Sequence, residues 1–273
     1  MHLGLIGFGN IATTLLELLP EALGRPLERL SVVSMPADAE PVRSRLARDF
    51  SAVARAFSVV CSSDQMEGRP DLVVECAGHG AVSSHVPGLL RAGIDVVVVS
   101  VGALAEPRIE AELKEAARAG NARLILPAGA IGGVDLLSAL KVAGDVKVSY
   151  RGIKPPAAWA GTPAERAVDL ERIRTAHVFF SGTAREAASA YPRNANVAAT
   201  LALAGPGFDA TEVTLVADPS APGNVHEYSV ASPLASYAVR IENRPSAGNA
   251  KTSVSTVYSV LREIRNRAGP LVI

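Results

Sequence analysis

Gly7-Phe8-Gly9-Asn10-Ile11-Ala12, near the start of the chain, fits the pattern G-x-G-x-x-G/A. It follows an apolar run, Leu3–Ile6, that is typical of a buried strand. It also opens the segment Gly9–Leu19, whose large apolar side chains recur at helical spacing. A G-x-G-x-x-G/A pattern between a strand and a helix predicts a loop that binds a dinucleotide.

Each small residue of this loop has its own role in such a site. Gly7 permits a tight turn, Gly9 lets the backbone approach a pyrophosphate, and Ala12 is small enough for close packing of helix on strand. Asn10 and Ile11 begin the helix, whose free N–H groups and partial positive charge attract phosphates. A strand, turn and helix that contain glycines but bind no ligand are the alternative interpretation.

The end of the second expected strand bears on the choice between NAD and NADP. Sites that prefer NAD usually carry an acidic residue there, which binds the ribose 2′-hydroxyl. Here the strand ends in Val33-Ser34-Met35-Pro36, and the first acidic residues, Asp38 and Glu40, come slightly later. Arg43 and Arg45 can face a 2′-phosphate or be solvated charges on a helix. The sequence therefore predicts NAD or NADP as cofactor without choosing between them.

Residues 1–126 alternate short apolar runs with helical patterns. Such alternation predicts βαβ units, and strands that are apolar on both faces, as in Val96–Val99, predict a parallel sheet covered on both sides. We expect a Rossmann-type doubly wound domain here. Further strands are expected at Leu30–Ser34, Phe57–Cys61, Leu72–Cys76, Asp95–Val101 and Arg123–Leu126, with helices at 41–56, 80–92 and 106–119.

The pattern changes at residue 127 to longer strands with period-2 alternation, which is typical of an antiparallel sheet with one packed face. Residues 127–250 are therefore expected to form a catalytic and dimerisation domain of the α+β class with a largely antiparallel sheet. Residues 251–273 hold a last helix, Thr252–Arg267, expected to pack back on the first domain. The expected strands are Lys147–Ile153, His177–Ser181, Thr211–Ala217, Val225–Ala231 and Ala235–Glu242.

Composition excludes several classes of function. The 27 basic and 27 acidic residues give zero net charge, which argues against a general nucleic-acid binder. The two cysteines, Cys61 and Cys76, lie in apolar runs and are expected to be buried thiols in a reducing compartment. No Cys/His cluster has zinc spacing, so no metal site is expected. With no signal peptide or membrane-spanning run, a cytoplasmic protein with a small-molecule substrate is predicted.

His226 is the strongest candidate for a proton carrier among the five histidines. It enters an expected strand, where Tyr228 and Val230 share its face. This places an imidazole on a fairly apolar face of the second domain. A core histidine with a purely structural hydrogen bond is the competing interpretation.

Several segments together resemble the L-aspartate dehydrogenase family, in order along nearly the whole chain. The glycine loop is shared by many families, whereas the later segments are more specific. These segments are Gly7-Phe8-Gly9-Asn10-Ile11, Glu75-Cys76-Ala77-Gly78-His79, Pro127-Ala128-Gly129-Ala130-Ile131-Gly132-Gly133, Lys154-Pro155-Pro156, Trp159-Ala160-Gly161-Thr162-Pro163, Asn194-Ala195-Asn196-Val197-Ala198-Ala199 and Gly223-Asn224-Val225-His226-Glu227.

The resemblance implies oxidation of L-aspartate by NAD or NADP to iminoaspartate. This imine either feeds quinolinate and NAD biosynthesis or hydrolyses to oxaloacetate and ammonia. By motif position, His226 corresponds to the family's catalytic histidine, and Ala130 and Asn196 correspond to cofactor-contacting positions. A homodimer is typical of the family.

The substrate adds one further requirement, because its two carboxylates need cationic or N–H partners. Lys154, Arg193 and Lys251 are the candidates, and the sequence does not choose among them. The alternatives to an aspartate dehydrogenase are a homoserine dehydrogenase-like or dipicolinate reductase-like oxidoreductase, and a sensor that binds NAD(P) without catalysis.

Overall fold

The chain forms two compact units in a computed structural model that describes residues 1–246 and 249–273, without the side chains of residues 193, 245–246 and 249–252. The N-terminal unit comprises residues 1–103, 107–127 and 257–273. The C-terminal unit comprises residues 104–106 and 128–256.

A six-stranded parallel sheet organises the N-terminal unit, with strand order β3-β2-β1-β4-β5-β6. The strands are β1 (His2–Ile6), β2 (Arg29–Val33), β3 (Phe57–Val60), β4 (Leu72–Glu75), β5 (Val96–Val98) and β6 (Leu124–Ile125). The order reverses between β1 and β4. Such a switch point leaves a crevice at the carboxyl ends of the strands, where ligands bind in sheets of this type.

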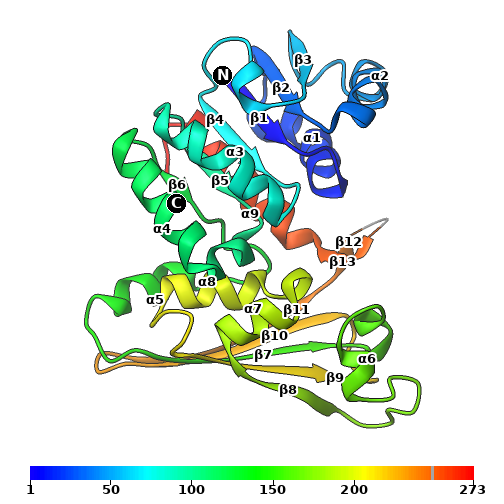
Figure 1. The fold of residues 1–273 in the computed structure, drawn as a ribbon, viewed down its shortest axis with the longest axis vertical. Coiled ribbons are helices and arrows are strands. Elements are labelled where there is room, and N and C mark those ends of the chain that lie inside the picture. The colour runs from blue at the N-terminus through cyan, green and yellow to red at the C-terminus, as the bar shows by residue number, and fades with distance from the viewer. Residues whose placement is uncertain (247–248) are drawn as a thin grey trace. The chain divides into compact units, whose positions relative to one another are not determined.

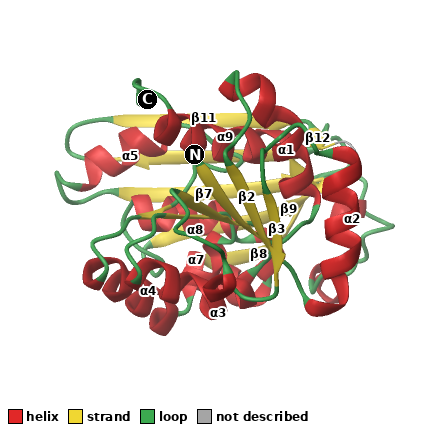
Figure 2. Ribbon diagram, turned by 90° about the horizontal axis from the view of Figure 1, so that it is seen from above, coloured by secondary structure: helices red, strands yellow, loops and turns green. Residues whose placement is uncertain are grey.

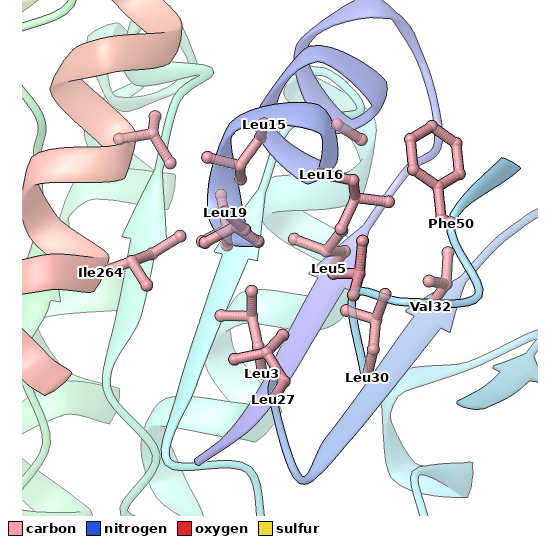
Figure 3. Close-up of a cluster of buried hydrophobic side chains, with 14 of the residues drawn as sticks. Leu3, Leu5, Leu15, Leu16, Leu19, Leu27, Leu30, Val32, Phe50 and Ile264 are labelled. Carbon is pink, nitrogen blue, oxygen red and sulfur yellow. The ribbon is translucent and has the colours of Figure 1, made fainter. Parts of the chain in front are cut away.

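Helices pack on this sheet through regularly spaced apolar side chains. They are α1 (Asn10–Leu23), α2 (Ala39–Asp49), α3 (His79–Arg91), α4 (Pro107–Ala119) and α9 (Val254–Ala268). Leu15, Leu16 and Leu19 of α1 lie over Leu3 and Leu5 of β1 (Figure 3). This buried cluster fixes where α1 begins, and therefore where its N-terminus points.

The C-terminal helix α9 contributes to the same buried cluster. Val257, Val260, Leu261 and Ile264 recur at helical spacing and are all buried there. Figure 3 shows Ile264 pointing towards the helix α1 side of the cluster. The last helix therefore completes the core of the N-terminal unit.

The C-terminal unit is built on a five-stranded mixed sheet of order β11-β10-β7-β9-β8, whose strands run side by side (Figure 2). The strands are β7 (Lys147–Lys154), β8 (His177–Thr183), β9 (Thr211–Ala217), β10 (Asn224–Ala231) and β11 (Ser236–Asn243). Only the β7–β9 pair is parallel among these described strands.

Helices α5 (Val134–Lys141), α7 (Ala184–Ala190) and α8 (Asn196–Ala204) lie along one face of this sheet (Figure 1). Val148 of β7 points to that face, because its side chain approaches Gly205 at the end of α8. By the period-2 alternation of a strand, Tyr150, Gly152 and Lys154 share the same face. A short helix, α6 (Ala164–Ala167), and a two-stranded pair, β12 (Pro245–Ser246) and β13 (Asn249–Ser253), complete the unit.

The predicted fold class, a parallel doubly wound sheet followed by an α+β part with a largely antiparallel sheet, is confirmed. The helix expected at 41–56 is too long, since α2 ends at Asp49. Residues 51–53 form a turn instead, in which the N–H of Val53 donates to the carbonyl of Phe50 at 2.9 Å. Ala54 then forms a bridge with Leu27, and Phe50 and Val53 enter the core.

Three further expectations were wrong. The last helix begins at Val254 and not at Thr252, because residues 249–253 pair as a strand with β12. Strand β5 ends at Val98, since the N–H of Ser100 is held by the carboxylate of Glu75. Cys61 is exposed, because it follows the last residue of the edge strand β3.

Candidate functional site

Gly7 makes a turn that no other residue can make at this position. It leaves β1 with φ at +92°, in the left-handed region, while its N–H donates to the carbonyl of Val33 at 2.9 Å. A Cβ on Gly7 would lie 2.7 Å from the Cβ of Ala77. The loops after β1 and β4 therefore touch, and only glycine permits that contact.

Gly9 stands at the start of α1 with open space where a side chain would be. A Cβ built there meets no atom within 4 Å, and Gly9, as the N-cap residue, has no side chain that could cap α1. An open backbone with donors at a helix N-terminus is the cradle that a pyrophosphate needs, so these residues fit a dinucleotide. Asn10 and Ile11 begin α1, and the Ile11 side chain packs on the core.

A cavity of about 460 Å³ opens beside this loop within the N-terminal unit. Ser34, Met35 and Asp38 line it from the segment after β2, and Arg45 lines it from α2. The Arg45 guanidinium lies 5.7 Å from the ring centroid of Phe8. Asp38 and Arg45 thus both line the cavity, the first with the charge that suits a ribose 2′-hydroxyl and the second with the charge that suits a 2′-phosphate. The charges of the cavity therefore do not choose between NAD and NADP.

Glu40 and Arg43 do not line the cavity. They form an ion pair with each other, both largely exposed. For Arg43 the interpretation as a solvated helix charge is therefore the better one.

Glu75 holds the loop after β4 in place. It is fully buried, and its carboxylate accepts hydrogen bonds from the N–H groups of Ala77 and Gly78, each at 2.8 Å. It also accepts from the N–H and hydroxyl of Ser100. A buried carboxylate with this many donors fixes two loops at the carboxyl end of the sheet. A charged residue at the end of an otherwise apolar strand was the signal in the sequence.

His226 lies on β10 in the C-terminal unit and is 5% exposed. Its Nδ1 is 2.8 Å from the hydroxyl oxygen of Tyr150 on β7. Burial, and secondarily the charge of Lys154, lower the pKa of His226 to about 4. The imidazole is therefore neutral at physiological pH and able to accept a proton.

Lys154, the last residue of β7, is 8% exposed. Its ammonium donates to Oδ1 of Asn194 at 2.6 Å and lies 5.0 Å from the ring centroid of Trp159. Trp159 is itself fixed, because its indole N–H donates to the carbonyl of Val216. A buried ammonium beside a neutral imidazole is a site that attracts an anion.

Three side chains of the C-terminal sheet donate hydrogen bonds to the loop that contains Ala130. Asn243 donates to the carbonyl of Ala130 at 2.9 Å, Tyr228 donates to the carbonyl of Gly132, and Tyr237 donates to the carbonyl of Gly133 at 3.3 Å. Ala130 is buried, so a ligand would meet it mainly through backbone atoms.

The predicted site residues thus fall into two groups, one in each unit. Gly7, Gly9, Asn10 and Ile11 are together in the N-terminal unit. Ala130, Lys154, Asn196 and His226 are in the C-terminal unit, with Asn196 opening α8. The side chains of Arg193 and Lys251 lie outside the described part of the structure.

Four polar residues that the sequence did not single out for a role belong to these sites: Glu75, Tyr150, Asn194 and Asn243. Asn194 had a weak signal in its amide-rich segment. Within the described residues, no three His, Cys, Asp or Glu side chains are grouped to hold a metal. None of the helices that the structure describes has the length and apolar character to cross a membrane.

The parallel sheet, its switch point and the open glycine loop define a dinucleotide-binding protein, and the second unit adds a buried acid–base group. This is the class to which NAD(P)-dependent dehydrogenases belong. Two family models match the chain: "Homoserine dehydrogenase, NAD binding domain" over residues 7–127 and "Aspartate dehydrogenase, C-terminal" over residues 135–267.

Relatives match over the full length. The chain is 46% identical to an L-aspartate dehydrogenase of Pseudomonas aeruginosa and 45% identical to one of a Polaromonas species, with 100% of each chain covered. Among solved structures, aspartate dehydrogenase from Thermotoga maritima has a TM-score of 0.77 and 29% identity, and covers 100% of this chain and 99% of its own. The chain belongs to the L-aspartate dehydrogenase family.

Substitution of the two loop glycines should separate folding from cofactor binding. We expect Gly7→Ala to lower the free energy of unfolding by about 1–3 kcal/mol, because of its positive φ and the contact with Ala77. We expect Gly9→Ala to fold normally, because its methyl group enters open space. The same methyl group would keep a pyrophosphate away from the backbone N–H groups, so NAD(P) should bind more weakly. Each lost hydrogen bond to a charged group is worth about 1.5–3 kcal/mol. Denaturant unfolding and cofactor titration measure the two effects. Unchanged NAD(P) affinity in Gly9→Ala would contradict the assignment of the loop.

The pKa of His226 should depend on Lys154. A nearby cation disfavours the imidazolium and so lowers the pKa; its removal must raise it. By NMR titration we expect His226 to stay neutral down to about pH 4, and Lys154→Met to move its pKa up towards the usual range. Lys147→Met, at the exposed start of β7, is the matched control. A pKa that stays or falls in Lys154→Met would refute the coupling.

Proposed function

We propose that this chain oxidises L-aspartate to iminoaspartate with NAD or NADP as the hydride acceptor. The observation that carries the proposal is a buried neutral His226 beside a buried Lys154, in a chain related over its whole length to L-aspartate dehydrogenases. The first supplies a proton acceptor, and the second supplies a partner for a carboxylate.

Lys154 binds one carboxylate of the substrate in this proposal. Asn194 and Trp159 hold its ammonium from two directions, so the cation is positioned before substrate arrives. A fixed charge loses little conformational entropy on binding. The side chains of Arg193 and Lys251 are the proposed partners for the other carboxylate.

His226 takes the proton from the α-ammonium group of aspartate. The amine nitrogen then has a lone pair, which forms the C=N double bond as the Cα–H bond breaks. NAD or NADP, held by the glycine loop, would supply the acceptor for that hydrogen and both electrons of the broken bond. The resulting iminium loses a proton to give iminoaspartate, which water converts to oxaloacetate and ammonia.

The low pKa of His226 in the free protein does not oppose this role. Aspartate carries two carboxylates against one ammonium group, and a net negative charge near an imidazole raises the pKa of that imidazole. Substrate binding therefore offsets the influence of Lys154 and makes His226 a stronger base at the moment when a base is needed.

The cofactor contacts are part of the same proposal. Gly7, Gly9, Asn10 and Ile11 would hold the pyrophosphate, and Ala130 and Asn196 are proposed as further cofactor contacts, as the family resemblance implies. The open cradle at Gly9 and the fastened loop at Ala130 support these assignments. We also propose that the protein is cytoplasmic. It would further be a homodimer whose product feeds NAD biosynthesis, as the family resemblance implies; light scattering of the purified protein tests the dimer.

Absorbance of the reduced nicotinamide tests the activity, with NAD and NADP each paired with L-aspartate, L-glutamate, L-alanine, D-aspartate and L-homoserine. We expect strong turnover only with L-aspartate. Turnover with L-homoserine alone would favour a homoserine dehydrogenase-like enzyme. Cofactor binding with no turnover on this panel would favour a dipicolinate reductase-like enzyme or a sensor.

Replacement of His226 tests the base. We expect His226→Ala to lower kcat by about 10²–10⁴, the usual contribution of a general base, with little change in NAD(P) affinity. His177→Ala removes an exposed imidazole at the start of β8 and should leave kcat unchanged. Near-normal turnover of His226→Ala would rule out His226 as the base.

A further inference from the structure

The side chain of Tyr150 extends over Gly152 of the same strand and contacts His226 on the neighbouring strand. On β7, Tyr150 pairs with Tyr228 of β10, and Gly152 pairs with His226. Tyr150 therefore starts one pair away from His226 on the same face of the sheet. Its hydroxyl nevertheless lies 2.8 Å from Nδ1 of His226, with the two ring planes inclined by 23°.

Gly152 leaves the space that this crossing needs. A Cβ on Gly152 would lie 2.8 Å from the Tyr150 hydroxyl oxygen and 3.2 Å from Cδ2 of Leu215, its neighbour on β9. The backbone of Gly152 is ordinary strand without positive φ, so conformation does not require glycine here. Glycine is therefore needed at this position because it has no side chain, and not because of its conformational freedom.

We propose that Tyr150 is a positioning residue for His226: its hydroxyl oxygen accepts the Nδ1–H of the imidazole and keeps Nε2 as the unprotonated nitrogen, and Gly152 makes room for this contact. The inference rests on the proposed role of His226 as a base. It goes beyond that role because it states which nitrogen acts and what selects it.

The chemistry of the two groups supports this assignment. A neutral imidazole carries one proton, so Nε2 can accept a proton only in the tautomer with Nδ1–H. A phenol oxygen can accept that N–H, and it can still accept it after His226 becomes imidazolium. Burial raises the pKa of Tyr150, so the phenol remains neutral and adds no charge. Among the described residues, the charged group that acts on His226 is Lys154.

The tautomer of His226 is the direct test. In protein labelled with ¹⁵N-histidine, NMR distinguishes a protonated ring nitrogen from a bare one, and the His226 signals are those absent from His226→Ala. We expect wild-type protein to show Nδ1–H and bare Nε2. We expect Tyr150→Phe to populate the other tautomer, whereas Tyr258→Phe, an exposed phenol on α9, leaves the spectrum unchanged. Wild-type protein with the proton on Nε2 would overturn the proposal.

Kinetics test the consequence for catalysis. Tyr150→Phe should lower kcat roughly tenfold while KM for aspartate and NAD(P) affinity change little, because the hydrogen bond is lost and the ring remains. Gly152→Ala should reproduce this loss, and the double variant should be no slower than Tyr150→Phe alone. Gly88→Ala, which adds a methyl group into open space on α3, is the control.

The outcomes separate this inference from the proposed function. Normal turnover of His226→Ala would remove the base role itself. An inactive His226→Ala together with a Tyr150→Phe variant of normal kcat and unchanged tautomer would overturn only the role of Tyr150. If Gly152→Ala does not fold, Tyr150→Phe still decides the matter.

Discussion

The contact between Gly7 and Ala77 is the constraint on which the N-terminal site depends. Gly7 must turn with positive φ while the loop after β4 lies against it. The buried carboxylate of Glu75 holds that second loop by accepting hydrogen bonds from its N–H groups. The leucines of α1 set the position of the helix from the other side. Three independent requirements therefore fix the position of one place, the N-terminus of α1 at Gly9.

In the C-terminal unit, the burial of polar groups costs free energy of folding. An ammonium and an imidazole inside a protein are unfavourable unless they have partners. Lys154 has Asn194 and the face of Trp159, and His226 has Tyr150. These contacts do not make the sheet more stable than apolar residues would. They hold a base and a cation in fixed positions, which is what the proposed oxidation of a dicarboxylic amino acid requires.

Local patterns in the sequence were sufficient for the fold class and for the glycine loop, because a turn and a helix start depend on neighbouring residues. His226 was identifiable as a candidate from its strand pattern and its resemblance to a family motif. Tyr150 was not, since its contact with His226 depends on strand register and on the empty space at Gly152. Tertiary contacts also explain why two helix boundaries were predicted wrongly. Phe50, just after α2, is buried in the core, and residues 249–253 pair with β12, so α9 begins later than expected.

In the proposed reaction, hydrogen passes from Cα of L-aspartate directly to a nicotinamide. The most direct measurement uses L-aspartate deuterated at C2, with mass spectrometry of the reduced cofactor after turnover. Transfer of the deuterium to the nicotinamide is the predicted result. Reduced cofactor without deuterium, or no reduced cofactor at all, would contradict the account.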